Sequence, residues 1–187
     1  MYKSFFKRFF DFVFGVIFVF ISVPLIVVFA CLIALESKGP IFFKQERLGK
    51  SGKTFILLKL RSLRINNERK ENQIFKDHPD MTPTGKFIRR FKIDGLPHIF
   101  NVLKGDMSIV GPRPCLPSLI EKFDENGYFR LKVRPGLTGC SQVNGNAYNS
   151  WATRWELDRY HVENMSLLLD FKILIATIGV VLFWRRK

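Results

Sequence analysis

The chain has 187 residues, which is long enough for one domain with its own hydrophobic core. Its 30 Lys and Arg against 16 Asp and Glu give a formal net charge of +14, which indicates a polyanionic partner such as nucleic acid, anionic lipid headgroups or a phosphorylated substrate. The three cysteines have spacings that fit neither a disulfide framework nor a zinc site, so a reducing compartment is favoured.

The stretch from Phe12 to Leu35 is apolar except for Ser22, with Gly15 and Pro24 as further irregularities. About 20 such residues suffice to cross a bilayer core. Basic residues mark the cytoplasmic side of a membrane segment, and here they lie on both flanks (Lys3, Lys7 and Arg8 before; Lys38, Lys44, Arg47, Lys50 and Lys53 after). A helix that breaks at Ser22 and Pro24 and returns would keep both flanks inside. A kinked spanning helix is the alternative.

Two short strands are predicted next, over residues 40–44 and 54–63, with a turn at residues 49–52. In the second strand Lys59 has apolar neighbours on both sides, which predicts either an inward-pointing cation or a lysine whose stem snorkels along the surface. Residues 84–91 follow as a basic helix that carries Arg89.

Residues 92–114 combine a helix start, a helix stop and a Gly-Pro-Arg-Pro turn. Apolar residues recur at helical spacing over residues 96–103, Pro97 suits a first turn, and Gly105 suits the C-terminal cap. Asp94 is therefore expected as the N-cap, at the positive end of a short helix where an ionised carboxylate is favoured. A purely structural cap is the alternative role.

The last third is predicted to hold a helix over residues 117–126, a Gly/Pro-rich turn with Arg134 over residues 133–139, and a further loop over residues 141–145. Trp151, Trp155 and Asp158 share one helical face, which suits either a membrane interface or the core. The apolar tail from residue 167 is expected to be an interfacial helix on an anionic leaflet, with a buried helix as the alternative.

The chemistry-bearing residues are Arg and Lys around Gly/Pro turns, together with a few acids. Arginine forks match phosphate oxygens, and the backbone N–H groups of glycine-rich turns add further anion contacts. A carboxylate beside such a cluster could hold Mg²⁺ or attack phosphorus. The residues alone thus predict a phosphate-handling site next to a membrane.

Several motifs resemble the bacterial sugar transferase family, the monotopic phosphoglycosyl transferases that start lipid-linked glycan assembly. The resemblance runs through almost the whole chain in order, and the long motif that ends in GPRP is its most specific part. The segments that carry it are KLRSL at 59–63, DGLP at 94–97, NVLKGDMSIVGPRP at 101–114, VRPGLTG at 133–139 and QVNG at 142–145.

The resemblance implies an α+β fold that is mostly helical, with a small β element, a re-entrant membrane helix over residues 1–36 and a catalytic domain over residues 37–187 with helices at the membrane interface. It implies a monotopic enzyme at the cytoplasmic face of the bacterial inner membrane that moves a phospho-sugar from a UDP-sugar to undecaprenyl phosphate and releases UMP, with Mg²⁺ as cofactor. Asp94 would be the nucleophile and a metal ligand, with Lys59 and Arg89 as catalytic residues. Substrate binding would fall to Arg113, Pro112, Arg134 and Asp158.

One departure from the family pattern stands beside the nucleophile, where Gly95 replaces the usual Glu. A catalytically weakened relative that binds UDP-sugar or organises a glycan-assembly complex is therefore an alternative to an active enzyme. A nucleic-acid partner is not expected, because the basic residues gather at Gly/Pro turns and form no long stripe. Neither the sugar nor the oligomeric state, which includes a possible homo-oligomer, follows from the sequence.

Overall fold

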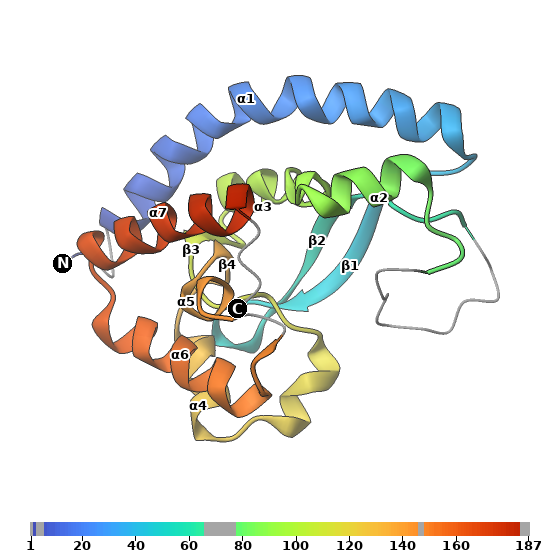
Figure 1. Ribbon diagram of the computed structural model, residues 1–187. Helices are drawn as coiled ribbons and strands as arrows, with labels where there is room; N and C mark the ends of the chain where they lie inside the picture. Colours follow the sequence, from blue (N-terminus) through green and yellow to red (C-terminus); the bar gives the residue numbers. More distant parts are fainter. Residues whose placement is uncertain (1, 3–5, 66–77, 146–147, 184–187) are drawn as a thin grey trace.

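The computed structural model describes residues 2, 6–65, 78–145 and 148–183 and has the α+β architecture expected from the sequence (Figure 1). Helices dominate, and two small two-stranded sheets lie among them. The elements in chain order are α1 (Lys7–Glu36), β1 (Phe42–Leu48), β2 (Thr54–Leu60), α2 (Pro83–Arg90), α3 (His98–Lys104), β3 (Ser108–Val110), α4 (Glu125–Phe129), β4 (Gly136–Thr138), α5 (Cys140–Val143), α6 (Trp151–Asn164) and α7 (Leu167–Phe183).

The first sheet is the antiparallel pair β1 and β2, close to the two predicted strands. Phe43 is paired with Lys59 in its register, and the turn between the strands contains the short 3₁₀ helix Lys50–Gly52. The second sheet pairs β3 with β4 in parallel, so part of the predicted turn at residues 133–139 is a strand. This strand is only three residues long, begins with Gly136 and lies between Pro135 and Gly139, which explains why its sequence resembles a turn.

The hydrophobic core is completed by the N-terminal helix. Ile26 and Ile33 of α1 are buried against Leu60 of β2 and Ile88 of α2. At Gly15 an added Cβ would lie 2.8 Å from the Leu103 side chain, so α1 and α3 pack closely there. Figure 1 shows α1 as an arch along one side of the molecule, with α7, α3 and α2 beneath it.

The beginning of α1 is joined to the domain by a buried carboxylate. Asp11 is 3% exposed, and its Oδ1 accepts the backbone N–H of Ile109 at 2.9 Å and the hydroxyl of Ser108 at 3.0 Å. Lys7 lies 3.5 Å from Asp11 and 2.7 Å from Asp170 of α7, so one lysine pairs with carboxylates of both helices.

The end of α1 is joined to the same domain by a buried arginine. Arg61, which follows β2, donates to the backbone oxygens of Ser37 at 2.5 Å and Lys38 at 2.8 Å. The carboxylate of Glu36 accepts the backbone N–H of Thr84 at 3.1 Å, in the first turn of α2. Both ends of a 30-residue helix, which is about 45 Å long, are therefore held against one domain.

Pro24 lies inside α1 without ending it, so the break predicted at Ser22 and Pro24 does not divide the helix. A single continuous helix bends instead, as Figure 1 shows, and a proline that removes one helical hydrogen bond is a known cause of such bends. Ser22 is buried on the side that faces the domain. The outer side carries large exposed apolar residues, and the helix is long and apolar enough to cross a membrane.

Two other local predictions need correction. The helix expected over residues 117–126 is a 3₁₀ helix, Pro117–Lys122, followed after Asp124 by the separate helix α4. Asp124 caps α4 by accepting the N–H of Gly127 at 2.7 Å, and a residue that caps a helix must itself have a non-helical backbone. The loop expected over residues 141–145 contains most of the short helix α5.

The last two helices settle the alternatives left open for them. In α6 Trp155 is 5% exposed and belongs to the interior, whereas Trp151 is 38% exposed and stacks on Arg154. In α7 Asp170 and Ile173 are buried, and the other side is exposed and apolar, so α7 is not a buried helix. The basic end expected at residues 185–187 lies outside the described residues. The exposed apolar residues of α7 are Leu167, Leu168, Phe171, Ile175, Ile178, Val180 and Val181.

Replacing Asp11 by Ala should destabilise the whole domain, because it leaves the buried N–H of Ile109 without an acceptor and separates α1 from β3. We expect the free energy of unfolding to fall by about 2–4 kcal/mol and the melting temperature in detergent to fall by several degrees. The exposed carboxylate Glu121 provides the control, since Glu121→Ala should leave the melting temperature within a degree or so. Equal melting temperatures for the two variants would contradict this role of Asp11.

Candidate active site

Asp94 lies in a 3₁₀ turn, Ile93–Gly95, between α2 and α3. Lys92 precedes this turn in the left-handed conformation, with φ at 60°, and α3 begins only at His98 with Pro97 as its N-cap. The prediction that Asp94 caps the helix is therefore wrong, because a capping side chain needs an extended backbone and Asp94 is already inside a helical turn. The predicted stop at Gly105, whose φ is 99°, is confirmed.

Three arginines from separate parts of the chain gather around Asp94 and Lys59. The pKa of Lys59, on β2, is shifted by the charges of Arg113, Asp94, Arg47 and Arg89. Arg47 comes from β1, Arg89 from the last turn of α2, and Arg113 from the loop after β3. The fold thus brings together the predicted residues Asp94, Lys59, Arg89 and Arg113, and it adds Arg47.

Positive charge outweighs negative charge in this cluster. Lys59 is half-buried, and its burial, together with the neighbouring Arg113, lowers the pKa of its ammonium group to about 8, although Asp94 acts in the opposite direction. The pKa of Arg47 is lowered to about 10, first by burial and then by Arg113. Cations that are crowded and partly desolvated without enough counter-charge suit an anionic ligand.

The loop that carries Arg113 is held by a close approach of two backbone segments. Gly136 donates its N–H to the carbonyl of Pro112 at 2.9 Å, and Gly111 donates its own to the carbonyl of Thr138 at 2.8 Å. A Cβ added at Gly136 would lie 2.1 Å from the backbone nitrogen of Gly111, so no side chain fits there. The arginine is therefore presented by a rigid backbone.

Asp158 and Pro112 support this loop from behind. Asp158 is 1% exposed, lies 3.2 Å from the Arg130 guanidinium, and accepts a hydrogen bond from Ser141 at 2.9 Å. Arg130 in turn donates to the carbonyl of Arg113. Asp158 and Pro112 are both buried, and through Arg130 and Gly136 they hold the backbone next to Arg113. Their predicted contact with substrate stays a prediction.

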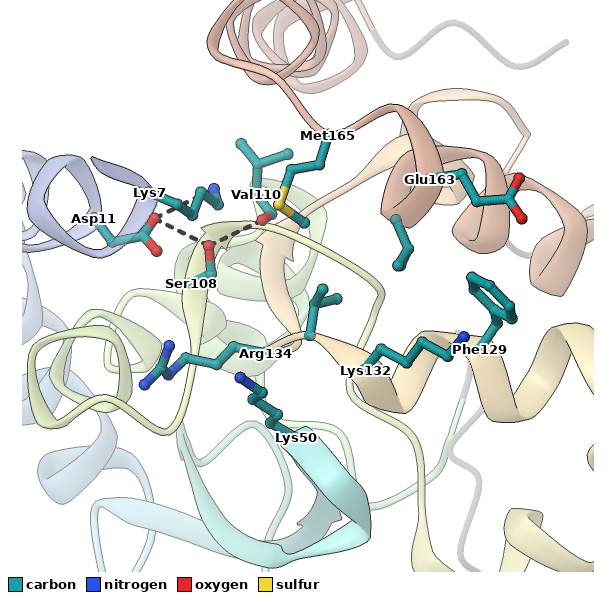
Figure 2. Close-up of a pocket in the computed structure, with 12 residues that line it drawn as sticks. Lys7, Asp11, Lys50, Ser108, Val110, Phe129, Lys132, Arg134, Glu163 and Met165 are labelled. Carbon is teal, nitrogen blue, oxygen red and sulfur yellow. Dashed lines mark hydrogen bonds and ion pairs between the residues drawn. The ribbon is translucent and has the colours of Figure 1, made fainter. Parts of the chain in front are cut away.

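Arg134 lies at a second basic site. It donates from Nε to the carbonyl of Gly105 at 2.7 Å, and it lines a cavity of about 480 Å³ together with Lys7, Lys50 and Lys132 (Figure 2). Its charge is not among those that shift the pKa of Lys59, Arg47 or His98. The predicted binding of substrate by Arg134 stays a prediction.

Two residues of the site were missed from the sequence. Arg47 was counted only as part of the basic flank of the membrane segment, and only its pairing in β1 shows that it faces the cluster. His98 was read as part of the helix, yet its ring lies next to Gly95, and its pKa is shifted by Lys59, Arg113 and Arg47. The alternation of side chains along the strand is the sequence signal for Arg47. For His98 the signal is its place one helical turn after Asp94.

A divalent cation would find few protein ligands here. Within the described residues no group of three or more His, Cys, Asp and Glu side chains converges, and Asp94 is the one carboxylate among the charges that shift the pKa of Lys59. Mg²⁺ is commonly held by one or two carboxylates together with substrate phosphates and water. The residues therefore fit an ion that is shared with a bound diphosphate, and they do not form a complete cage.

Comparison with known proteins places the chain in a family. The model of the bacterial sugar transferase family matches residues 2–184, and the chain belongs to this family. It is 41% identical to the sugar transferase EpsL of Bacillus subtilis over 94% of this chain and 87% of that protein.

Two further relatives carry substrate names. The UDP-N-acetylgalactosamine-undecaprenyl-phosphate N-acetylgalactosaminephosphotransferase of Aeromonas hydrophila is 42% identical over 96% of this chain and 44% of that protein. The undecaprenyl-phosphate galactose phosphotransferase of Salmonella typhimurium is 34% identical over 96% of this chain and 41% of that protein. The chain thus spans less than half the length of these two relatives.

The affinity of the cluster for a nucleoside diphosphate should fall as the pH rises through about 8. Lys59 is charged below this pH and neutral above it, so the site loses one cation over that range. We expect the dissociation constant, measured by calorimetry, to be roughly threefold to tenfold higher at pH 9.5 than at pH 7.5. Lys59→Arg should remove most of this dependence, because a guanidinium keeps its charge at these pH values. An equally steep decline in that variant would rule out Lys59 as its source.

Proposed function

We propose that the protein transfers a phospho-sugar from a UDP-sugar to undecaprenyl phosphate and releases UMP, and so starts the assembly of a lipid-linked glycan. The observation that carries this proposal is the position of one carboxylate, Asp94, among the cations Lys59, Arg47, Arg89 and Arg113. Family membership and the names of the relatives support the same reaction class.

In the first step Asp94 acts as the nucleophile. One carboxylate oxygen attacks the β-phosphorus of the UDP-sugar, and the bond from that phosphorus to the bridging oxygen breaks. UMP leaves, and the phospho-sugar stays on Asp94 as an acyl phosphate. Lys59 and Arg113 bind the diphosphate oxygens and offset the charge that would otherwise repel an attacking carboxylate.

In the second step a phosphate oxygen of undecaprenyl phosphate attacks the same phosphorus. The bond from phosphorus to Asp94 breaks, and the products are a polyprenyl diphosphate sugar and the free carboxylate. The phosphate of the lipid is already ionised at neutral pH, so this step needs no general base. Two displacements replace one direct reaction between two anions.

Mg²⁺ would be held by Asp94 and by oxygens of the bound diphosphate, where it would neutralise charge on the leaving group. Because Gly95 provides no carboxylate, the cations of the chain carry a larger share of this role. Lys59, Arg47 and Arg113 hold and orient the diphosphate, and the supported loop around Arg113 fixes one of these cations in place.

The apolar side of α1 would lie in the membrane in a re-entrant arrangement. Both ends of the helix contact the same domain, through Asp11 at one end and Glu36 at the other, so a straight crossing would separate groups that are bonded here. The exposed apolar residues of α7, which is joined to the start of α1 by the Lys7–Asp170 ion pair, would add to this apolar surface. With basic flanks, this surface suits the anionic cytoplasmic leaflet of the cell membrane.

A weakened relative that only binds UDP-sugar is the second candidate, and the absent side chain at Gly95 favours it. The two functions differ in one observable, since both require UDP binding but only the enzyme releases UMP.

Replacing Asp94 by Asn should abolish UMP release while UDP still binds, because the amide is no nucleophile but leaves the cations in place. The assay contains purified protein, Mg²⁺, undecaprenyl phosphate and a panel of UDP-sugars. Asp106→Asn, at the other end of α3, is the matched control and should keep most of the activity. Turnover by Asp94→Asn would contradict the nucleophile assignment. UDP binding without UMP release from any sugar by the unaltered protein would favour the second candidate.

The re-entrant arrangement predicts that both flanks of α1 lie on one side of the membrane. Cysteines are introduced one at a time at Lys3 and Lys38 in a Cys31→Ser background, in which the two remaining cysteines, Cys115 and Cys140, are buried. Both introduced cysteines should give the same result, either labelling or protection, when a membrane-impermeant maleimide is added to right-side-out vesicles. Opposite labelling of the two positions would indicate a spanning helix.

A further inference from the structure

The imidazole of His98 occupies the space beside Gly95. A Cβ added at Gly95 would lie 3.3 Å from both Cε1 and Nδ1 of this ring. Gly95 is not among the glycines with positive φ, so its own backbone would accept a side chain. The neighbouring ring is what limits the space there. Gly95, the residue after Asp94, has no side chain, and the ring of His98 lies next to where that side chain would begin.

The other nitrogen of this ring is buried and unused. Nε2 of His98 has no hydrogen-bond partner among the described residues. A buried polar atom left in this state costs about 1–3 kcal/mol, so it calls for a partner that binds during function. The unused nitrogen is therefore a second observation at the site, independent of the packing against Gly95.

The surroundings determine which partner fits. Burial, followed by the charges of Lys59, Arg113 and Arg47, lowers the pKa of His98 to about 3, so the ring is neutral at physiological pH. A neutral imidazole donates from one nitrogen and accepts at the other. The three nearby cations attract an anion to the space next to the ring. Such an anion can accept a hydrogen bond from the N–H of the imidazole.

We propose that His98 contacts the substrate, with its Nε2–H donating a hydrogen bond to a phosphate oxygen of the diphosphate bound at Lys59 and Arg113. This inference rests on the proposed function for the identity of the diphosphate, though not on turnover. His98 would thereby help to position the phosphorus in front of Asp94, in a site where Gly95 contributes nothing.

The test measures UDP binding to the purified full-length protein by calorimetry, in EDTA and again in Mg²⁺. His98→Ala should weaken UDP binding about tenfold under both conditions, as expected for the loss of one hydrogen bond to a charged group. His98→Gln, whose amide can still donate, should stay within about threefold of the original protein. His78→Gln is the control for replacing a histidine elsewhere.

A second variant tests the contact between Gly95 and His98 while the His98 side chain itself is unchanged. Gly95→Ala should displace the ring and weaken UDP binding severalfold, whereas the same change should have little effect in the His98→Ala protein. This non-additivity is the mark of two residues in contact. A purely structural role of His98 would lower the melting temperature but would leave this coupling absent.

Two results would overturn the inference. The first is an unchanged UDP affinity in His98→Ala or Gly95→Ala. The second is a loss of affinity that occurs only in Mg²⁺, which would mean that the ring acts through the metal. Failure of the proposed function looks different, because UDP would then bind with the His98 dependence described and no UMP would be released.

Discussion

The structure depends on the attachment of one long apolar helix to the domain at both of its ends. At one end the carboxylate of Asp11 accepts hydrogen bonds from the β3 strand, and at the other Arg61 binds the carbonyls of Ser37 and Lys38, which directly follow the helix. Between these ends Ile26 and Ile33 complete the core with β2 and α2. Removing α1 would therefore expose part of the core as well as the membrane surface. The helix is a structural part of the catalytic unit and cannot be treated as a detachable anchor.

The candidate site has an excess of positive charge. At the start of α1, by contrast, Lys7 is paired with the two carboxylates Asp11 and Asp170. Around Asp94 the cations outnumber the carboxylates, and burial and mutual repulsion lower the pKa of Lys59. Such an arrangement destabilises the folded protein locally, and a bound anion, such as the proposed diphosphate, would relieve it. The rigid backbone around Gly111 and Gly136, with Arg130 and Asp158 behind it, keeps the repelling groups in place.

The sequence predicted most of the elements but only part of the site. Helical periodicity, Gly105 and the alternation around Lys59 are local signals, and the structure agrees with them. The distinction between a residue that contacts ligand and one that supports it is not local. Asp158 lies on a helical face with two tryptophans, and only the structure shows that it is buried against Arg130. Arg47 and His98 are not evident from the sequence for a similar reason, because strand pairing places Arg47 at the site and the first turn of α3 places His98 next to Gly95.

The contacts of Asp11 also limit the order in which the protein can fold during its synthesis. Its partners Ser108 and Ile109 lie 97 and 98 residues later in the chain, and Asp170 must still join Lys7 after that. At a synthesis rate of about 5–20 residues per second, roughly 4–15 seconds pass between the completion of α1 at Glu36 and the synthesis of Ser108 and Ile109. The inner side of α1 can pack on β2 and α2 during this interval, whereas its outer apolar side favours a bilayer. We therefore expect the helix to enter the membrane before the domain is complete.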